Sequence, residues 1–195
     1  MRHAHQPFTD AEALASTLDD PARDAWQQPD DVLRAMELAP TMCVADVGAG
    51  TGYFAVRLAR AVPEGQVSAT DIEQNMVRFL NERARREGLT NLRGLLATQS
   101  SSGLKRDSVD RILVVHMWHH LLNRGALARD LYAALRPGGR LFVVDFAVAA
   151  LRGPPPSIRV APESIIAELE AVGLTAMVLA VAVPDQYIVE ARRDP

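Results

Sequence analysis

Three glycines stand close together directly after a short apolar run, in the stretch VADVGAGTGYF that covers Val44 to Phe54. Glycine has no Cβ, so it serves where the backbone must turn tightly, adopt a positive φ or lie against a ligand. Gly48, Gly50 and Gly52 also precede a segment of helical period, and backbone N–H groups at such a helix start bind ligands readily. The loop therefore predicts a strand, a tight turn and a helix that together form a binding site built largely from the main chain.

Short apolar runs alternate with segments of helical period along the rest of the chain. The strand-like runs are 43–47, 66–70, 92–97, 111–116, 140–146, 175–181 and 186–192, and the helical segments are 51–61, 74–87, 121–135 and 162–172. Parallel strands need crossover helices, whereas only about four residues separate the last two runs, a length that permits a hairpin. We expect an α/β, Rossmann-like, doubly wound seven-stranded sheet, mostly parallel with one antiparallel strand in a C-terminal hairpin, and helices on both faces.

The length of 195 residues suits one sizeable core. We expect residues 41–195 to form a single domain and residues 1–40 a helical extension, with short helices near 9–18 and 30–39. This extension either forms part of a lid over the site or packs over the sheet edge. Residues 147–161 form a Pro- and Gly-rich loop that is longer than a tight connection needs, as is typical of functional loops.

Composition narrows the function classes. A net charge of −3 provides no positive field for phosphate backbones, so we expect no nucleic-acid partner. The single cysteine, Cys43, excludes an internal disulfide and a thiolate metal knuckle. No apolar run is long enough for a membrane span, and the first residues lack the apolar core of a secretory signal. These features predict a cytoplasmic monomer or homodimer with no membrane partner.

The spacing of the glycines separates two kinds of cofactor. A dinucleotide fingerprint, Gly-x-Gly-x-x-Gly, would need a third glycine at position 53, which is Tyr53. Asp46 stands two residues before the first glycine, where it would repel a pyrophosphate and attract a cationic amino group. A dinucleotide oxidoreductase is therefore the weaker interpretation.

Four ordered motifs extend this pattern over about residues 42–146: ADVGAGTGYFA, VSATDIEQNM, VDRILVVHMWHHL and LRPGGRLFVVDF. Together they resemble the class I S-adenosylmethionine-dependent methyltransferases, which implies S-adenosyl-L-methionine as cofactor and S-adenosyl-L-homocysteine as product. The resemblance implies that Asp71 accepts both ribose hydroxyls and that Ile72 lies beside the adenine. It also implies contacts to the methionine part from Asp46, Gly48, Ala49, Gly50 and Gly52.

One departure from the family pattern lies after the third strand. The stretch LLATQSSSGLKRDSVD lacks the acid that many members place near the adenine amino group, and Thr98 and Gln99 stand there instead. The amide of Gln99 can hydrogen-bond an adenine edge, so we expect altered affinity and no loss of binding.

Three histidines cluster at the end of the fourth strand: His116, His119 and His120. Histidine titrates near neutral pH, so each is a candidate catalytic base, and the resemblance also places His116 beside the amino group of the cofactor. The alternative is that they only fill the turn between strand and helix. A metal site is not expected, because no further ligands follow at a familiar spacing.

Three further residues are candidates for binding the methyl acceptor. Tyr53 faces either the methionine end of the cofactor or the lid, and Trp118 either lines the acceptor pocket or packs in the core. Asp145 ends the fifth strand as a candidate polar contact.

These observations predict an enzyme that transfers a methyl group in line from S-adenosylmethionine to a small molecule. The alternative is a non-catalytic module that binds the cofactor or its product and stabilises or activates a partner enzyme. Fold and cofactor do not determine the acceptor.

Overall fold

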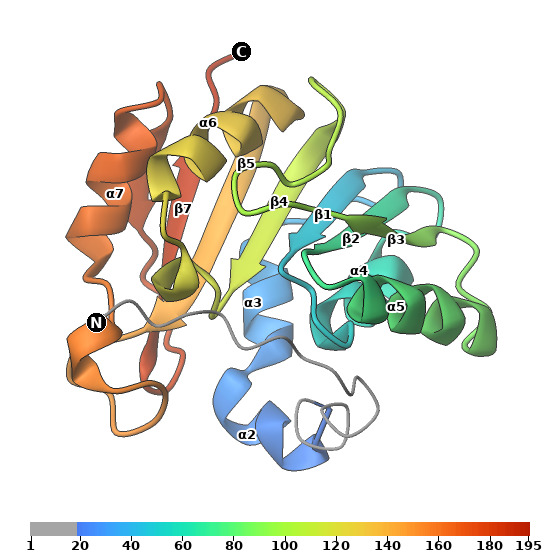
Figure 1. Cartoon of the computed structure of the whole chain (residues 1–195), viewed down its shortest axis with the longest axis horizontal. Coiled ribbons are helices and arrows are strands. Elements are labelled where there is room, and N and C mark those ends of the chain that lie inside the picture. Colours follow the sequence, from blue (N-terminus) through green and yellow to red (C-terminus); the bar gives the residue numbers. More distant parts are fainter. Residues whose placement is uncertain (1–18) are drawn as a thin grey trace.

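The computed structural model describes residues 19–195, which are organised around a seven-stranded sheet (Figure 1). The strands are β1 (Cys43–Val47), β2 (Gln66–Asp71), β3 (Leu92–Leu96), β4 (Val109–Val115), β5 (Leu135–Phe146), β6 (Thr175–Val178) and β7 (Gln186–Arg192). Their order is β3-β2-β1-β4-β5-β7-β6. Only β7 runs antiparallel to its neighbours β5 and β6, and the other adjacent strands pair in parallel. The predicted fold class is confirmed.

The order of the strands locates the binding crevice. From β1 the chain winds outward through β2 to β3, and it then returns to place β4 on the other side of β1. The direction of winding thus reverses between β1 and β4. In open α/β sheets, ligands bind beyond the carboxyl ends of the strands at such a point, which here is where the glycine loop leaves β1.

Helices cover both faces of the sheet, as the period of the sequence predicts. The helices are η1 (Pro21–Arg23), α2 (Asp24–Gln27), α3 (Pro29–Ala35), α4 (Tyr53–Ala61), α5 (Gln74–Arg86), η2 (Trp118–His120), α6 (Arg124–Ala134), η3 (Pro156–Ile158) and α7 (Pro162–Glu170). Val44 and Leu113 pack with α3, α4 and α5, whereas their neighbours Ala45 and Ile112 pack with α6 and α7. This alternation is the period of two of a strand that is buried on both faces. None of the helices within residues 19–195 is long and apolar enough to cross a membrane.

Several boundaries differ from the expected ones. β5 begins at Leu135, which pairs with Val109 before a register shift, and Gly138 continues the strand at a φ of +75°. α3 ends at Ala35 because Glu37 adopts a left-handed φ of 49°. The short helices η1 and α2 were not anticipated, and the helix expected near 9–18 lies outside the described residues. The division at residue 40 stays a prediction, although Val32 of α3 packs into the core of the domain.

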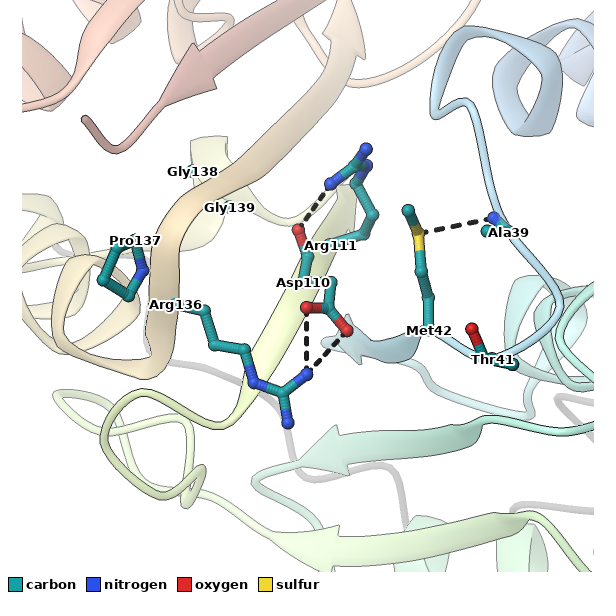
Figure 2. A pocket seen from close by; sticks show the side chains of 9 residues that line it. All are labelled: Ala39, Thr41, Met42, Asp110, Arg111, Arg136, Pro137, Gly138 and Gly139. Carbon is teal, nitrogen blue, oxygen red and sulfur yellow. Dashed lines mark hydrogen bonds and ion pairs between the residues drawn. The ribbon is translucent and has the colours of Figure 1, made fainter. Parts of the chain in front are cut away.

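A cavity of about 330 Å³ lies at the amino ends of β1 and β4, at the opposite end of the sheet from the glycine loop (Figure 2). Arg136 donates to both carboxylate oxygens of Asp110 at 2.9 and 2.8 Å. Arg111 donates to the main-chain oxygens of Met36 and Asp110, both at 2.9 Å. These two guanidinium groups hold β5 and the end of α3 against β4, so we assign them a structural role.

Gly65, which precedes β2, is a position where packing alone requires glycine. An added Cβ would lie 2.0 Å from the main-chain oxygen of Met42. We expect Gly65→Ala to lower the free energy of unfolding in urea by about 1–3 kcal/mol, because backbone must move. The control is Gly125→Ala in α6, where the nearest atom is 3.8 Å away and where alanine should stabilise the helix by up to about 1 kcal/mol. Equal stabilities of the two variants would contradict this account.

Candidate functional site

The glycine loop joins β1 to α4 and is fixed to the neighbouring strand. Gly48, Gly50 and Gly52 all have positive φ, at 77°, 54° and 92°. The N–H groups of Gly48 and Ala49 both donate to the main-chain oxygen of Thr70 on β2, at 2.8 and 3.0 Å. The loop is therefore held across the carboxyl ends of two parallel strands, and α4 begins directly after it at Tyr53.

Two of the glycines are also required by packing within the chain. An added Cβ on Gly48 would lie 2.8 Å from Cγ of Met117, and one on Gly52 would lie 2.7 Å from Cδ2 of Leu80. The local sequence pattern predicts a tight turn and a ligand site, but it does not reveal either of these distant neighbours. Glycine here serves both the close approach of Met117 and Leu80 and the left-handed backbone.

Asp71 ends β2 with its carboxylate oriented by main-chain donors. Its Oδ2 accepts from the N–H of Gly50 and its Oδ1 from the N–H of Glu73, both at 2.9 Å. Each carboxylate oxygen can accept more than one hydrogen bond, so the pair can still receive donors from a ligand. Ile72, the next residue, leaves 39% of its surface exposed, which is unusual for a large apolar side chain beside a crevice.

The end of β3 pairs with the end of β2 at Asp71. The N–H of Ala97 donates to the main-chain oxygen of Asp71 at 2.8 Å, which brings the following residues Thr98 and Gln99 to this part of the crevice. Both are exposed. The Thr98 hydroxyl accepts from the N–H of Ser101 at 3.1 Å and so shapes the loop.

Asp46 lies inside the sheet on β1 and is only 3% exposed. Its Oδ2 has no hydrogen-bond partner among residues 19–195. Burial raises the pKa of this carboxyl to about 7, while the positive charge of Arg23 acts in the opposite direction. A buried carboxylate oxygen without a partner calls for a donor that the described part of the chain does not supply, and a cationic amino group fits this position.

His116 directly follows β4 and has a φ of 52°, which is uncommon for a residue other than glycine. Its Nε2 lies 2.8 Å from Oε1 of Gln186, while Nε2 of Gln186 donates to the main-chain oxygens of Trp26 and Pro184 at 2.9 and 3.1 Å. The amide orientation is thereby fixed, so His116 carries its proton on Nε2. Burial lowers the pKa of His116 to about 4, which disfavours this histidine as a general base near neutral pH.

His119 and Asp145 form a buried pair. Nδ1 of His119 lies 2.8 Å from Oδ1 of Asp145, and each side chain is 2% exposed. Donation from Nδ1 leaves the lone pair of Nε2 as the basic position of the neutral ring. Oδ2 of Asp145 has no hydrogen-bond partner in the part of the chain that the structure describes. His120 is exposed, and the centroid of its ring lies 4.1 Å from that of the His119 ring. Within residues 19–195, no three His, Cys, Asp or Glu side chains are grouped so that they could hold a metal ion.

The two aromatic candidates lie in different surroundings. Trp118 is fully buried and donates through Nε1 to Oε2 of Glu168 on α7 at 2.8 Å, which favours core packing over a place in the acceptor pocket. Tyr53 is 4% exposed, and the guanidinium groups of Arg23 and Arg57 each lie 4.0 Å from the centroid of its ring. Its hydroxyl donates to the carboxylate of Asp24, so Tyr53 faces α2.

Residues 19–27 also contact the site. No pattern in the sequence distinguishes these residues from the rest of the expected extension. This 19–27 segment lies beyond the carboxyl ends of the parallel strands (Figure 1). Gln27 is fully buried and donates to Oε1 of Gln186 at 2.7 Å, and the Trp26 ring is stacked on His116 at 5.8 Å. Asp19 accepts from the hydroxyl of Thr51 at 3.1 Å. The only local indication in the sequence is a tryptophan in an otherwise polar stretch.

The raised pKa of Asp46 predicts a pH-dependent cost to folding. The folded protein binds the Asp46 proton more tightly than the unfolded chain, whose reference pKa is 3.8, so folding free energy is lost as the pH rises from about 4 to about 7. We expect Asp46→Asn to gain stability relative to the unchanged protein across this window, on the order of 1–4 kcal/mol. Urea unfolding at pH 4 to 8 measures the difference, and a difference that does not change with pH would contradict the prediction.

Comparison with known proteins agrees with this geometry. A family model described as a methyltransferase domain matches residues 44–139. The ubiquinone/menaquinone biosynthesis C-methyltransferase UbiE of Marinomonas is 29% identical over 106 residues, which cover 53% of this chain and 42% of that protein. The malonyl-[acyl-carrier protein] O-methyltransferase of Methylococcus capsulatus is 34% identical over 114 residues, which cover 57% of this chain and 40% of that protein. The chain thus spans less than half the length of these two curated relatives.

The likeness to a solved structure covers nearly the whole chain. The crystal structure of an S-adenosylmethionine-dependent methyltransferase from Aquifex aeolicus superposes with a TM-score of 0.83 at 27% identity, and the match covers 94% of this chain and 97% of that one. The glycine loop between β1 and α4, the oriented carboxylate at the end of β2 and the reversal of strand order between β1 and β4 are consistent with these matches. The chain belongs to the class I S-adenosylmethionine-dependent methyltransferase family.

Proposed function

We propose that the protein transfers a methyl group from S-adenosylmethionine to a small-molecule acceptor. The observation that carries this proposal is the pairing of two carboxylates around the glycine loop. Asp46 is buried, with one oxygen that has no partner within the described residues, and Asp71 is held by two main-chain donors. The first suits the amino group and the second the ribose hydroxyls of an adenosyl amino acid.

The remaining cofactor contacts are proposed from position in the crevice. Gly48, Ala49, Gly50 and Gly52 would lie along the methionine part, and His116 beside its amino group. Ile72, Thr98 and Gln99 would lie around the adenine, where the exposed face of Ile72 offers an apolar contact. The bound cofactor supplies a methyl group already activated on a sulfonium sulfur. The protein mainly has to hold the donor and acceptor in line and exclude water.

For the acceptor, we propose His119 as general base and Asp145 as the residue that orients it. Asp145 accepts from Nδ1 of His119 at 2.8 Å, which directs the basic Nε2 away from the carboxylate. Such a pair can take a proton from a hydroxyl, phenol or amine as it is methylated. His120 is the alternative base, and Tyr53 and Trp118 are weaker candidates for acceptor contacts because their side chains face α2 and the core.

The named relatives support a small acceptor and do not specify the atom that is methylated. One is named as a C-methyltransferase of ubiquinone/menaquinone biosynthesis and another as an O-methyltransferase of a malonyl group on acyl-carrier protein. The loop over 147–161 is held by Arg159, whose guanidinium donates to the main-chain oxygens of Ala150 and Pro154 at 2.7 and 2.9 Å. We propose this loop as part of the boundary of the acceptor pocket.

Cofactor binding is the first test. We expect S-adenosylmethionine and S-adenosylhomocysteine, but not NADH, to bind in calorimetric titrations. Asp71→Ala should lose about 1.5–3 kcal/mol of binding free energy, as expected for hydrogen bonds to a charged group. Asp30→Ala, an exposed carboxylate in the first turn of α3, serves as the control and should bind as the unchanged protein does. Binding of NADH alone, or of none of the three, would refute the proposal.

Turnover with mixed phenol, hydroxyl, amine, thiol and carboxylate acceptors tests the roles of the histidines. His119→Asn retains an amide donor toward Asp145, so it should lower kcat by about 10²- to 10⁴-fold with acceptors that lose a proton and leave affinity for S-adenosylhomocysteine nearly unchanged. His120→Asn is the matched control. Unchanged turnover in the first variant would exclude His119 as the base. Cofactor binding without turnover of any acceptor by the unchanged protein would favour the non-catalytic module.

A further inference from the structure

Glu168 lies on α7 and joins this helix to two points of the chain that follow β4. Its Oε2 accepts from Nε1 of Trp118 in η2 at 2.8 Å, and its Oε1 pairs with Nε of Arg124, the first residue of α6, at 3.0 Å. The helices α6 and α7 lie side by side on this face of the sheet (Figure 1). One carboxylate thus holds the segment that carries His119 at two points, one on each side of this histidine.

The short helix η2 needs such an anchor because it is a single turn of three residues. A 3₁₀ helix has three residues per turn, so successive side chains point about 120° apart. Trp118 points toward α7, His119 toward β5, and His120 lies at the surface. The direction of the indole therefore also sets the direction of the neighbouring imidazole.

The acceptor for this indole is well suited to hold it. Trp118 is fully buried, and a buried indole N–H needs an acceptor. A carboxylate forms a hydrogen bond about twice as strong as a neutral acceptor does. The second bond, to Arg124, restricts the rotation of the Glu168 side chain, so the carboxylate presents Oε2 to the indole in one orientation.

The orientation of the His119 ring decides its chemistry. Oδ1 of Asp145 also accepts from the N–H of Phe146 at 2.8 Å, so the main chain of β5 fixes this carboxylate. The other partner, His119, is placed by η2 and keeps its proton on Nδ1 only while the distance of 2.8 Å to Asp145 is maintained. A displacement of about 1 Å caused by a change far from the reacting atoms can lower a rate by about 100-fold.

We propose that Glu168 is a positioning residue for the His119–Asp145 pair. By holding the indole of Trp118 it sets the rotation of η2, and it thereby keeps the His119 proton on Nδ1 and the basic Nε2 free for the acceptor. This inference rests on the proposed function, in which His119 is the general base. It gives α7, which packs against the sheet, a part in the reaction.

The test uses the full chain, Glu168→Ala and Glu168→Gln, whose amide oxygen can still accept from the indole. The control is Glu170→Ala, which removes an exposed carboxylate at the end of the same helix. The ¹⁵N chemical shifts of the histidine rings, recorded at a pH where His119 is neutral, show which nitrogen carries the proton. His119→Asn identifies the His119 signals among those of the five histidines.

We expect Glu168→Ala to change the His119 ring from the Nδ1-protonated form to a mixture of both forms. The same variant should lower kcat by about 10- to 100-fold with acceptors that lose a proton, and it should leave the affinity for S-adenosylhomocysteine unchanged. Glu168→Gln should keep the Nδ1-protonated form and most of kcat. Glu170→Ala should match the unchanged protein in all three measurements.

Three results would overturn the inference. The first is an unchanged His119 ring and an unchanged kcat in Glu168→Ala. The second is a parallel loss of kcat and of affinity for S-adenosylhomocysteine, which would indicate a general structural role. The third is an equal loss in Glu168→Gln, which would show that the charge toward Arg124 matters and the indole bond does not.

Failure of the proposed function would give a different result. If the unchanged protein methylated no acceptor, the proposed function would be wrong and Glu168 would have no part in a reaction. The ring signals of His119 in Glu168→Ala would still show whether the carboxylate holds this histidine, because they require neither an acceptor nor the cofactor.

Discussion

The geometry of the site depends on the attachment of the glycine loop to β2. Two successive N–H groups of the loop, from Gly48 and Ala49, share the carbonyl of Thr70, and the next one, from Gly50, binds the carboxylate of Asp71. The parallel register places Val47 opposite Thr70, so the sheet itself sets where the loop begins. The parts of the site proposed for the two ends of the cofactor are therefore joined by main-chain hydrogen bonds, and side-chain rotamers have little influence on their separation.

The sheet could be predicted from the sequence because its strands are apolar, short and bounded by turn residues. The same pattern predicts the carboxyl ends of β1, β2, β4 and β5. It therefore also predicts the positions of Asp46, Asp71 and Asp145 at or near these ends. By contrast, the 19–27 segment is polar and has no period. Its contacts join Gln27 to Gln186 across 159 positions, and local sequence patterns carry no information about such pairs.

For the three clustered histidines, the residue type alone does not reveal which side chain can act as a base. In the sequence they are nearly adjacent and chemically identical. The short helix η2 turns the chain here, so that His116 faces an amide and His119 a carboxylate, whereas His120 lies at the surface. These surroundings, and not the histidine side chain alone, determine which ring can accept a proton. The same applies to Trp118, whose indole finds its partner on α7.

The amide of Gln186 has no hydrogen-bonding capacity to spare. Its oxygen receives donors from Gln27 and His116, and its two N–H bonds end on carbonyl oxygens. A carboxylate at this position would face two carbonyls without hydrogen atoms to offer, and an apolar side chain would deprive four polar groups of their partner. Substitutions at positions 27, 116 and 186 should therefore be coupled, because the end of α2, the residue after β4 and the first residue of β7 share these hydrogen bonds.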